Sequence, residues 1–102
     1  MENKSLITTK SDWGVGILHK NHIVYSFVKG SPAFYSPLIS GDIVYSVDNN
    51  FLDDEDTLDL SGKYNSYTKI KVLREKSIIK VKLKRTMYIK KKWLKTDFVY
   101  KN

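Results

Sequence analysis

Two glycines near the start of the chain form the first candidate for binding chemistry. Gly14 and Gly16 flank Val15 and precede an apolar segment that begins at Ile17. Glycines at this spacing let the backbone turn tightly, so that several amide N–H groups face one point. Such a group of amides can hold an anion, and a carboxylate is its natural guest. Lys10, four residues before Gly14, would add a positive charge nearby.

Acidic and histidine residues raise the question of a metal site. The run from Asp53 to Asp59 holds five carboxylates. A calcium loop of the helix–loop–helix type needs alternating oxygen ligands, a mid-loop glycine and a late glutamate, and this run has no such order. His19 and His22 are the only histidines, and they lack a third ligand. We therefore predict no metal and no cofactor, and we assign the carboxylates to the start of a helix.

Composition argues against a catalytic role. The chain has no cysteine, which excludes disulfides, thiolate metal sites and cysteine nucleophiles. Serines and lysines are plentiful, but no local pattern marks a serine–lysine nucleophile pair. At 102 residues, of which 41% are hydrophobic, the chain suffices for one domain with a modest core. We expect a monomeric, non-enzymatic domain.

Charge is distributed unevenly along the chain. Residues 1–62 carry four Lys or Arg against nine Asp or Glu, and residues 63–102 carry fourteen against two, so the net charges are −5 and +12. The predicted basic face consists of two groups of lysines: Lys80, Lys82 and Lys84, then Lys90, Lys91 and Lys92. Such a face attracts polyanions, either nucleic acid or an anionic membrane. The alternatives are a solvated lysine face and, for the tail, packing of its apolar residues on the domain.

The elements that would position these residues are mostly strands. Apolar and cationic residues alternate in Thr68–Arg74 and in Ile79–Lys84, which predicts an antiparallel hairpin with one buried face. The β-branched and aromatic segments Ile23–Val28 and Ile43–Val47 predict further strands. Short helices are predicted at Pro32–Ser36, with Ser31 as N-cap, and at Asp53–Gly62. The predicted fold is mostly β (α+β): a small, partly open antiparallel barrel or sandwich of five to six strands with two short helices.

Several of these segments together resemble PDZ domains. Gly14-Val15-Gly16-Ile17 is similar to the carboxylate-binding loop of that family, with a basic residue four positions upstream. Gly30-Ser31-Pro32-Ala33 and Gly41-Asp42-Ile43-Val44-Tyr45-Ser46-Val47-Asp48 resemble the core of bacterial PDZ domains in tail-specific and high-temperature-requirement serine proteases. The resemblance implies a PDZ-like domain over residues 10–85. Residues 1–9 would be an arm or first strand, and residues 86–102 a basic aromatic extension that supplies a strand or helix.

The resemblance also implies a binding mode. An extended peptide would add as a strand beside Ile17–Lys20, opposite the predicted helix, and its carboxylate would bind the amides of Val15, Gly16 and Ile17. The implied groove residues are Leu18, His19, Lys20, Asp54, Leu58 and Ser61. Asp54 would favour a basic or hydroxylated ligand side chain, and His19 would make binding sensitive to pH. The chain end at Tyr100–Asn102 could itself fill the groove. An excised bacterial domain of this kind would be periplasmic, and a complete chain cytoplasmic.

Overall fold

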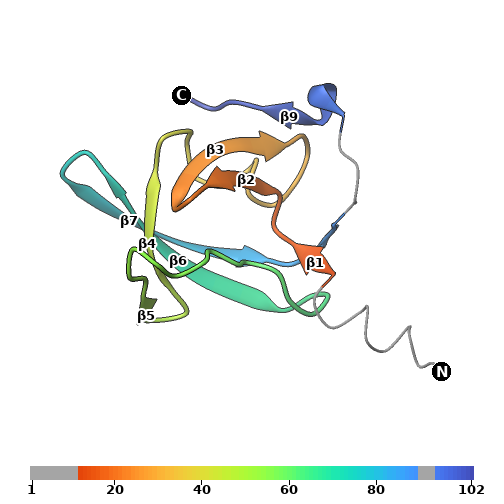
Figure 1. The fold of residues 1–102 in the computed structure, drawn as a ribbon. Coiled ribbons are helices and arrows are strands. Elements are labelled where there is room, and N and C mark those ends of the chain that lie inside the picture. The colour runs from red at the N-terminus through yellow and green to blue at the C-terminus, as the bar shows by residue number, and fades with distance from the viewer. Residues whose placement is uncertain (1–11, 90–93) are drawn as a thin grey trace.

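The computed structural model describes residues 12–89 and 94–102 of the chain, and these residues are almost entirely β (Figure 1). The strands are β1 (Trp13–Gly14), β2 (Ile17–Lys20), β3 (Ile23–Val28), β4 (Ile43–Val47), β5 (Asn50–Phe51), β6 (Tyr67–Arg74), β7 (Ser77–Lys84), β8 (Met87–Tyr88) and β9 (Phe98–Val99). One short 3-10 turn, η1 (Lys95–Asp97), precedes β9. The predicted predominance of β structure is confirmed.

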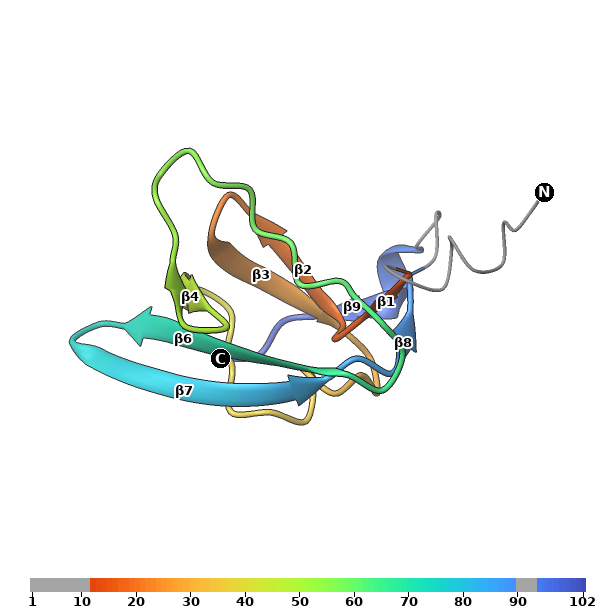
Figure 2. The ribbon, with the colours of Figure 1, turned by 90° about the horizontal axis from the view of Figure 1, so that it is seen from below.

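The strands form two antiparallel sheets. The larger has the order β2-β3-β4-β6-β7, with β5 paired to β4 and β9 paired to β3; the smaller consists of β1 and β8. Figure 2 shows the long β6–β7 hairpin lying across the molecule below β3 and β2, with the segment from β5 to β6 running alongside β2. Among the described strands β2 does not pair with β7, so the larger sheet stays open and no closed barrel forms.

Tight turns fix the hairpins. The β6–β7 register runs without interruption from Tyr67 opposite Lys84 to Arg74 opposite Ser77, as the alternating pattern predicted. Glu75 takes a φ of 56° in its two-residue turn, and Asp48 and Asn49 take φ values of 51° and 70° between β4 and β5. Two successive positive φ values give a turn whose twist matches that of the flanking strands.

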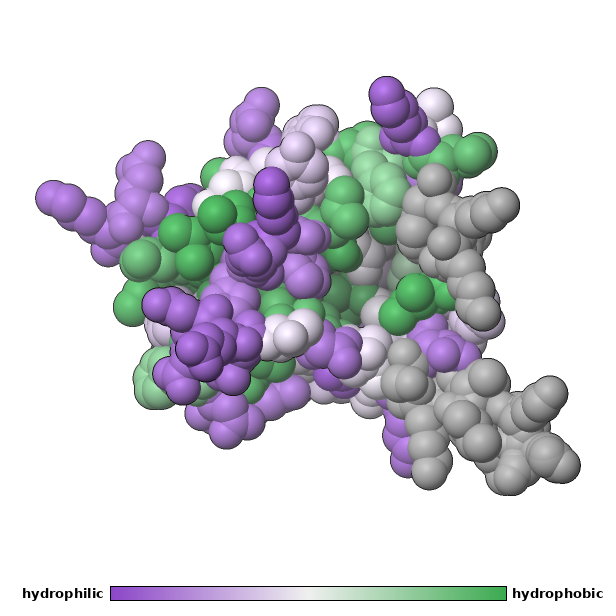
Figure 3. Space-filling model, in the orientation of Figure 1, coloured by the Kyte–Doolittle hydropathy of each residue, from purple (hydrophilic) through white to green (hydrophobic). Residues whose placement is uncertain are grey.

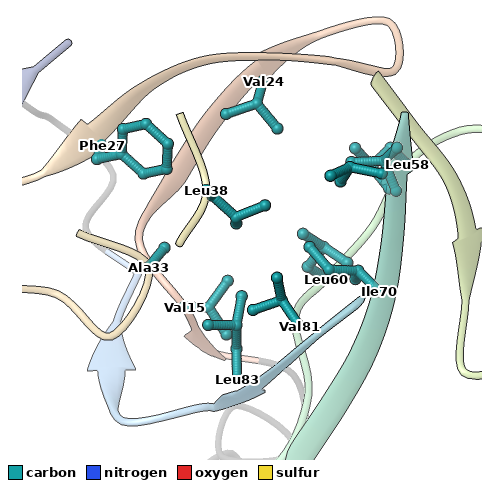
Figure 4. Packing of buried hydrophobic residues seen from close by; sticks show 12 residues of the cluster. Val15, Val24, Phe27, Ala33, Leu38, Leu58, Leu60, Ile70, Val81 and Leu83 are labelled. Carbon is teal, nitrogen blue, oxygen red and sulfur yellow. The ribbon is translucent and has the colours of Figure 1, made fainter. Parts of the chain in front are cut away.

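The core lies between the curved sheet and the loops that cover it. Inward residues of β3, β4, β6 and β7 meet Val15, the turn after β3 and the segment after β5. Figure 4 shows these side chains pointing toward one common interior. The most deeply buried apolar residues are Val24, Phe27, Ala33, Leu38, Val44, Ile70 and Val72.

The helix predicted at Asp53–Gly62 was wrong. Residues 53–56 make one turn, in which the Asp56 carboxylate accepts a hydrogen bond from the Asp53 amide at 2.8 Å, and residues 57–62 are extended. Leu58 and Leu60 are both buried, at 4% and 7% exposure, whereas Asp59 between them is exposed. A helix would place residues two apart on nearly opposite sides. Only an extended backbone places both leucines in the core. The alternation of buried and exposed residues therefore decides the conformation, and the acidic residues, which favoured a helix start, do not.

The helix predicted at Pro32–Ser36 was also wrong, because it stops after a single turn. Ser31 acts as the predicted cap, since its hydroxyl accepts a hydrogen bond from the Phe34 amide at 3.1 Å. The turn has two helix-type backbone bonds: the Tyr35 amide bonds the Ser31 carbonyl at 3.3 Å, and the Ser36 amide bonds the Ala33 carbonyl at 3.2 Å. Pro37 has no amide hydrogen and disfavours helix in the residue before it, so a second turn cannot follow.

A partly buried ion pair joins the central strands to the segment that follows this turn. Asp42 is 1% exposed, and its carboxylate accepts hydrogen bonds from the Arg74 Nε and Nη2 atoms, each at 2.8 Å, and from the Ile39 amide at 2.9 Å. Arg74 also donates to the Pro37 carbonyl at 2.8 Å. The Asp42 hydrogen bond raises the pKa of Arg74 above its ordinary value. The carboxylate therefore ties the start of β4, the end of β6 and residues 37–39 together.

The C-terminal extension supplies β8 and β9, and Lys101 anchors its end. The Lys101 ammonium donates to the carbonyl oxygens of Ala33, Phe34 and Ser36 at 2.8 to 2.9 Å and lies 4.3 Å from the centre of the Phe27 ring. Burial lowers the pKa of this group. The Phe34 and Ser36 carbonyls would accept bonds within a longer helix, so the lysine satisfies acceptors that the interrupted turn leaves open. Its bond to the Ala33 carbonyl adds to those that Ser36 already donates there.

Replacing Asp42 should weaken the whole domain. Asp42→Asn keeps the shape but loses the charge that two guanidinium nitrogens contact, and we expect the free energy of unfolding to fall by about 2–3 kcal/mol. Urea denaturation measures this change, with the exposed Glu55→Gln as a control that should stay within about 0.5 kcal/mol of the parent. Equal stability of both variants would contradict the role assigned to the ion pair.

Candidate functional site

A cleft of about 210 Å³ lies between β2 and the extended segment after β5. Its lining is mainly apolar and comes from four parts of the chain: residues 14–19, Val28, residues 58–61, and residues 87–89 with Phe98. The predicted glycine loop therefore stands at one wall, and Leu58 and Ser61 stand at the other. The structure brings together the two segments that the resemblance placed on opposite sides of a groove, although the second wall is not a helix.

The glycine loop directs its amides away from the body of the protein. The Val15 carbonyl accepts a hydrogen bond from the Ala33 amide, and the Gly16 carbonyl accepts one from the Val28 amide, both at 2.9 Å. Every peptide bond described is trans, so the N–H on the far side of each peptide plane points the opposite way. The N–H groups of Gly16 and Ile17 therefore point together away from residues 28–33. Among the described residues, the amides of Val15 and Gly16 find no backbone acceptor.

The outer edge of β2 continues this row of free backbone groups. His19 lies opposite Val24 of β3, but the Val24 amide and carbonyl bond Asp42 and Gly41 at 2.8 Å instead. The backbone N–H and C=O of His19 therefore point to the other side of β2, as those of Ile17 do. Within the described residues β2 pairs only with β3, so Ile17 and His19 present donors and acceptors on an unpaired edge.

Close packing on Ser31 fixes the loop conformation. Gly16 has a φ of 91°, and a Cβ at this position would overlap the Ser31 side chain. Ser31 is fully buried, and its hydroxyl also lies 3.5 Å from the Gly16 carbonyl. Any side chain at position 16 would therefore meet both backbone strain and a collision.

The second wall is held by hydrogen bonds in place of helical structure. Arg85 is 9% exposed and donates from Nε to the Leu60 carbonyl at 2.9 Å. Trp13 and Gly62 exchange two backbone hydrogen bonds, at 2.8 and 3.2 Å. Asp59 accepts bonds from the Ser61 hydroxyl at 2.6 Å and the Ser61 amide at 3.0 Å.

Those two Ser61 bonds hold the pKa of the Asp59 carboxyl below its ordinary value, and weaker attractions to Arg85 and His19 act in the same direction. The cleft thus has a negative charge on the wall that faces β2.

Not every residue predicted for the site lies in the cleft. Lys20 is exposed and does not line it, whereas Leu18 and His19 do. Asp54 lines a separate hollow at the other end of β2, with Glu55, Asp56 and His22, and this hollow shares His19 and Leu58 with the cleft. Lys10 and Lys90–Lys92 lie outside the described residues. The chain end does not fill the cleft, because Lys101 is bound at residues 33–36.

The sequence analysis missed several apolar residues of the lining, among them Leu60, Met87, Ile89 and Phe98. Leu60 could have been found, because Leu58-Asp59-Leu60 alternates at period two. The other three belong to the C-terminal extension, which reaches the cleft only through the pairing of β8 with β1 and of β9 with β3. Both pairings use strands of two residues, which carry no recognisable pattern.

Comparison with known proteins adds no family. No family model matches the chain, and no curated protein matches it. The resemblance to PDZ domains therefore remains a prediction. In the described part of the chain no three His, Asp or Glu residues gather into a group that could hold a metal ion. None of the described helical segments is long and apolar enough to cross a membrane.

Alanine substitutions at Gly16 and Gly30 should distinguish the cost of backbone strain from the cost of a steric collision. Gly16→Ala places a Cβ against Ser31, whereas Gly30→Ala, with a φ of 76°, meets open space. We expect Gly30→Ala to cost about 1–2 kcal/mol of unfolding free energy, and Gly16→Ala a further 1–3 kcal/mol or so. Thermal and urea unfolding of both variants measure the difference. Equal losses would mean that Ser31 does not constrain the loop.

Proposed function

We propose that this domain binds the C-terminal end of an extended peptide by adding it as a strand to β2. The observation that carries the proposal is the row of outward backbone groups at Gly16, Ile17 and His19, next to an apolar cleft. Strand addition needs an unpaired edge for main-chain bonds and a pocket for side chains. Capture of the peptide's C-terminal carboxylate also needs convergent amides at one end of that edge, and the glycine loop supplies them.

The geometry sets the direction of the ligand. The amides of Gly16 and Ile17 stand at the start of β2, so the ligand carboxylate lies there and the rest of the peptide runs toward Lys20. The peptide is therefore antiparallel to β2 and forms its backbone bonds with Ile17 and His19. Its last side chain enters the cleft, whose volume of about 210 Å³ is below that of small-molecule sites and suits one apolar side chain.

Electrostatics favours basic residues upstream of the ligand terminus. Asp59 lies on the wall opposite β2, and Asp54, Glu55 and Asp56 line the hollow that continues past His19. A peptide that runs along β2 passes these carboxylates after leaving the cleft. We therefore expect selectivity for an apolar last residue preceded by lysine, arginine or hydroxylated residues.

Amidation of the peptide end should weaken this binding. We expect peptides ending in Leu, Ile, Val or Phe to shift the amide signals of Val15–Lys20 and Leu58–Ser61 in two-dimensional NMR spectra of labelled protein. A C-terminal amide loses the charge that the loop amides bind, and its affinity should be at least about tenfold lower. Equal shifts with the acid and amide forms would exclude capture of the terminus.

A matched pair of variants tests strand addition itself. His19→Pro removes the outward N–H of the β2 edge without removing a bond to β3, whereas His19→Ala keeps that N–H. We expect His19→Pro to abolish peptide binding and His19→Ala to change the affinity by less than about threefold. Fluorescence anisotropy of a labelled peptide measures both, and the amide spectra report whether each variant is folded. Binding by a folded His19→Pro variant would contradict the proposed backbone pairing.

A further inference from the structure

The solvent-facing side of the larger sheet carries a continuous apolar row. The registers place Ile23 of β3 opposite Ile43 of β4, Ile43 opposite Leu73 of β6, and Leu73 opposite Ile78 of β7. These four side chains are 40–57% exposed. Three inter-strand spacings make the row about 14 Å long. An apolar row across four strands is not required by the core, which the opposite face of the sheet already serves.

A ladder of lysines borders this row on the same face. Lys71 stands opposite Lys80, Lys69 opposite Lys82, and Tyr67 opposite Lys84, in successive steps away from Leu73 and Ile78. Like charges directly opposite each other destabilise a sheet. Within the described residues, no acidic side chain forms an ion pair with any of these five lysines, and the neighbouring Arg74 pairs with Asp42. The Asp48 carboxylate lies beside the ladder, where it accepts a hydrogen bond from the Lys69 backbone amide at 2.8 Å, but it forms no ion pair with a ladder lysine. The like charges therefore stay opposed across the hairpin, which costs stability.

Charge and apolar surface occur together at one end of the molecule. Figure 3, which views the molecule from the side of β2 and β3, shows hydrophobic surface next to projecting polar side chains at the left, where the β6–β7 hairpin tip extends past the body. Tyrosines stand at the borders of the face: Tyr67, 4.5 Å from the Lys82 ammonium, and Tyr25, which packs edge-on against Tyr100. A ring with an apolar body and a polar tip suits the boundary between hydrocarbon and water.

We propose that this face, defined by the apolar row and the lysine ladder, docks on the surface of an anionic lipid membrane. Phosphate and carboxylate headgroups are complementary to the lysines, and the apolar row enters the layer beneath the headgroups. Nucleic acid would use the ladder but leave the four aliphatic side chains without a partner. A protein interface would place aromatic residues and arginine at its centre, where lysine is depleted.

Membrane docking and peptide capture use separate residues. None of the residues of the apolar row or the ladder lines the cleft between β2 and residues 58–61. A peptide in the cleft and a membrane on the sheet face can therefore be bound together. The inference does not depend on the proposed function, and either can fail alone.

Vesicle sedimentation tests the proposal. We expect the protein to bind phosphatidylcholine vesicles that contain phosphatidylserine, and to bind vesicles of phosphatidylcholine alone at least about tenfold more weakly. Replacing Lys69, Lys71, Lys80 and Lys82 by glutamine should reduce binding by at least about tenfold. The matched control replaces four exposed lysines elsewhere, Lys20, Lys29, Lys63 and Lys95, and changes the net charge equally. It should keep most of the binding.

Serine substitutions in the apolar row distinguish binding to lipid from binding to other polyanions. Leu73→Ser with Ile78→Ser should weaken vesicle binding about tenfold, whereas Leu94→Ser, exposed but off this face, should not. The lysine variant should unfold at the same or a higher temperature than the parent, because it removes opposed charges. Three results would overturn the proposal. The first is no preference for anionic vesicles, and the second is an equal loss of vesicle binding in the lysine control. The third is that the protein binds a single-stranded oligonucleotide and that the two serine substitutions change neither this binding nor vesicle binding.

Discussion

The close approach of Gly16 to Ser31 is the constraint on which the cleft depends. Because the loop packs against a buried side chain, the carbonyls of Val15 and Gly16 are held by the amides of Ala33 and Val28. Trans peptide geometry then leaves their neighbouring N–H groups no direction but outward. The outward direction of the loop amides thus follows from what the loop carbonyls bind. A glycine loop whose carbonyls faced solvent would present amides in no fixed direction.

Hydrogen bonds from charged side chains hold the segments that are not in regular secondary structure. Arg85 supports the extended wall through the Leu60 carbonyl, Arg74 bridges to Asp42, and Lys101 binds three carbonyls of an interrupted turn. Each of these groups is wholly or partly removed from water, so each needs partners in fixed positions. The irregular segments around the cleft are therefore held by specific hydrogen bonds. Single substitutions at these charged residues should alter the shape of the cleft, although none of them lines it.

Prediction from the sequence succeeded where apolar and polar residues followed a single regular period throughout a segment. The alternation in Thr68–Arg74 and in Ile79–Lys84 predicted both strands of the hairpin and their buried faces, and Ser31 capped its turn as expected. It failed at 53–62, where acidic residues favoured a helix and two buried leucines required an extended chain. It also missed the tail's share of the cleft, because β8 and β9 are two residues long and are stabilised by tertiary contacts that no local pattern encodes.

The uneven charge of the chain acquires a spatial meaning in the fold. Acidic residues 53–59 flank the cleft and its continuation, while the lysines of β6 and β7 share one face of the sheet with the apolar row. Opposed like charges cannot be explained by stability, since the hairpin would be more stable without them. The same holds for half-exposed isoleucines at positions where a polar residue would fit a strand equally well. Features that lower stability or solubility without serving the core point to a partner, and here they lie together on one surface.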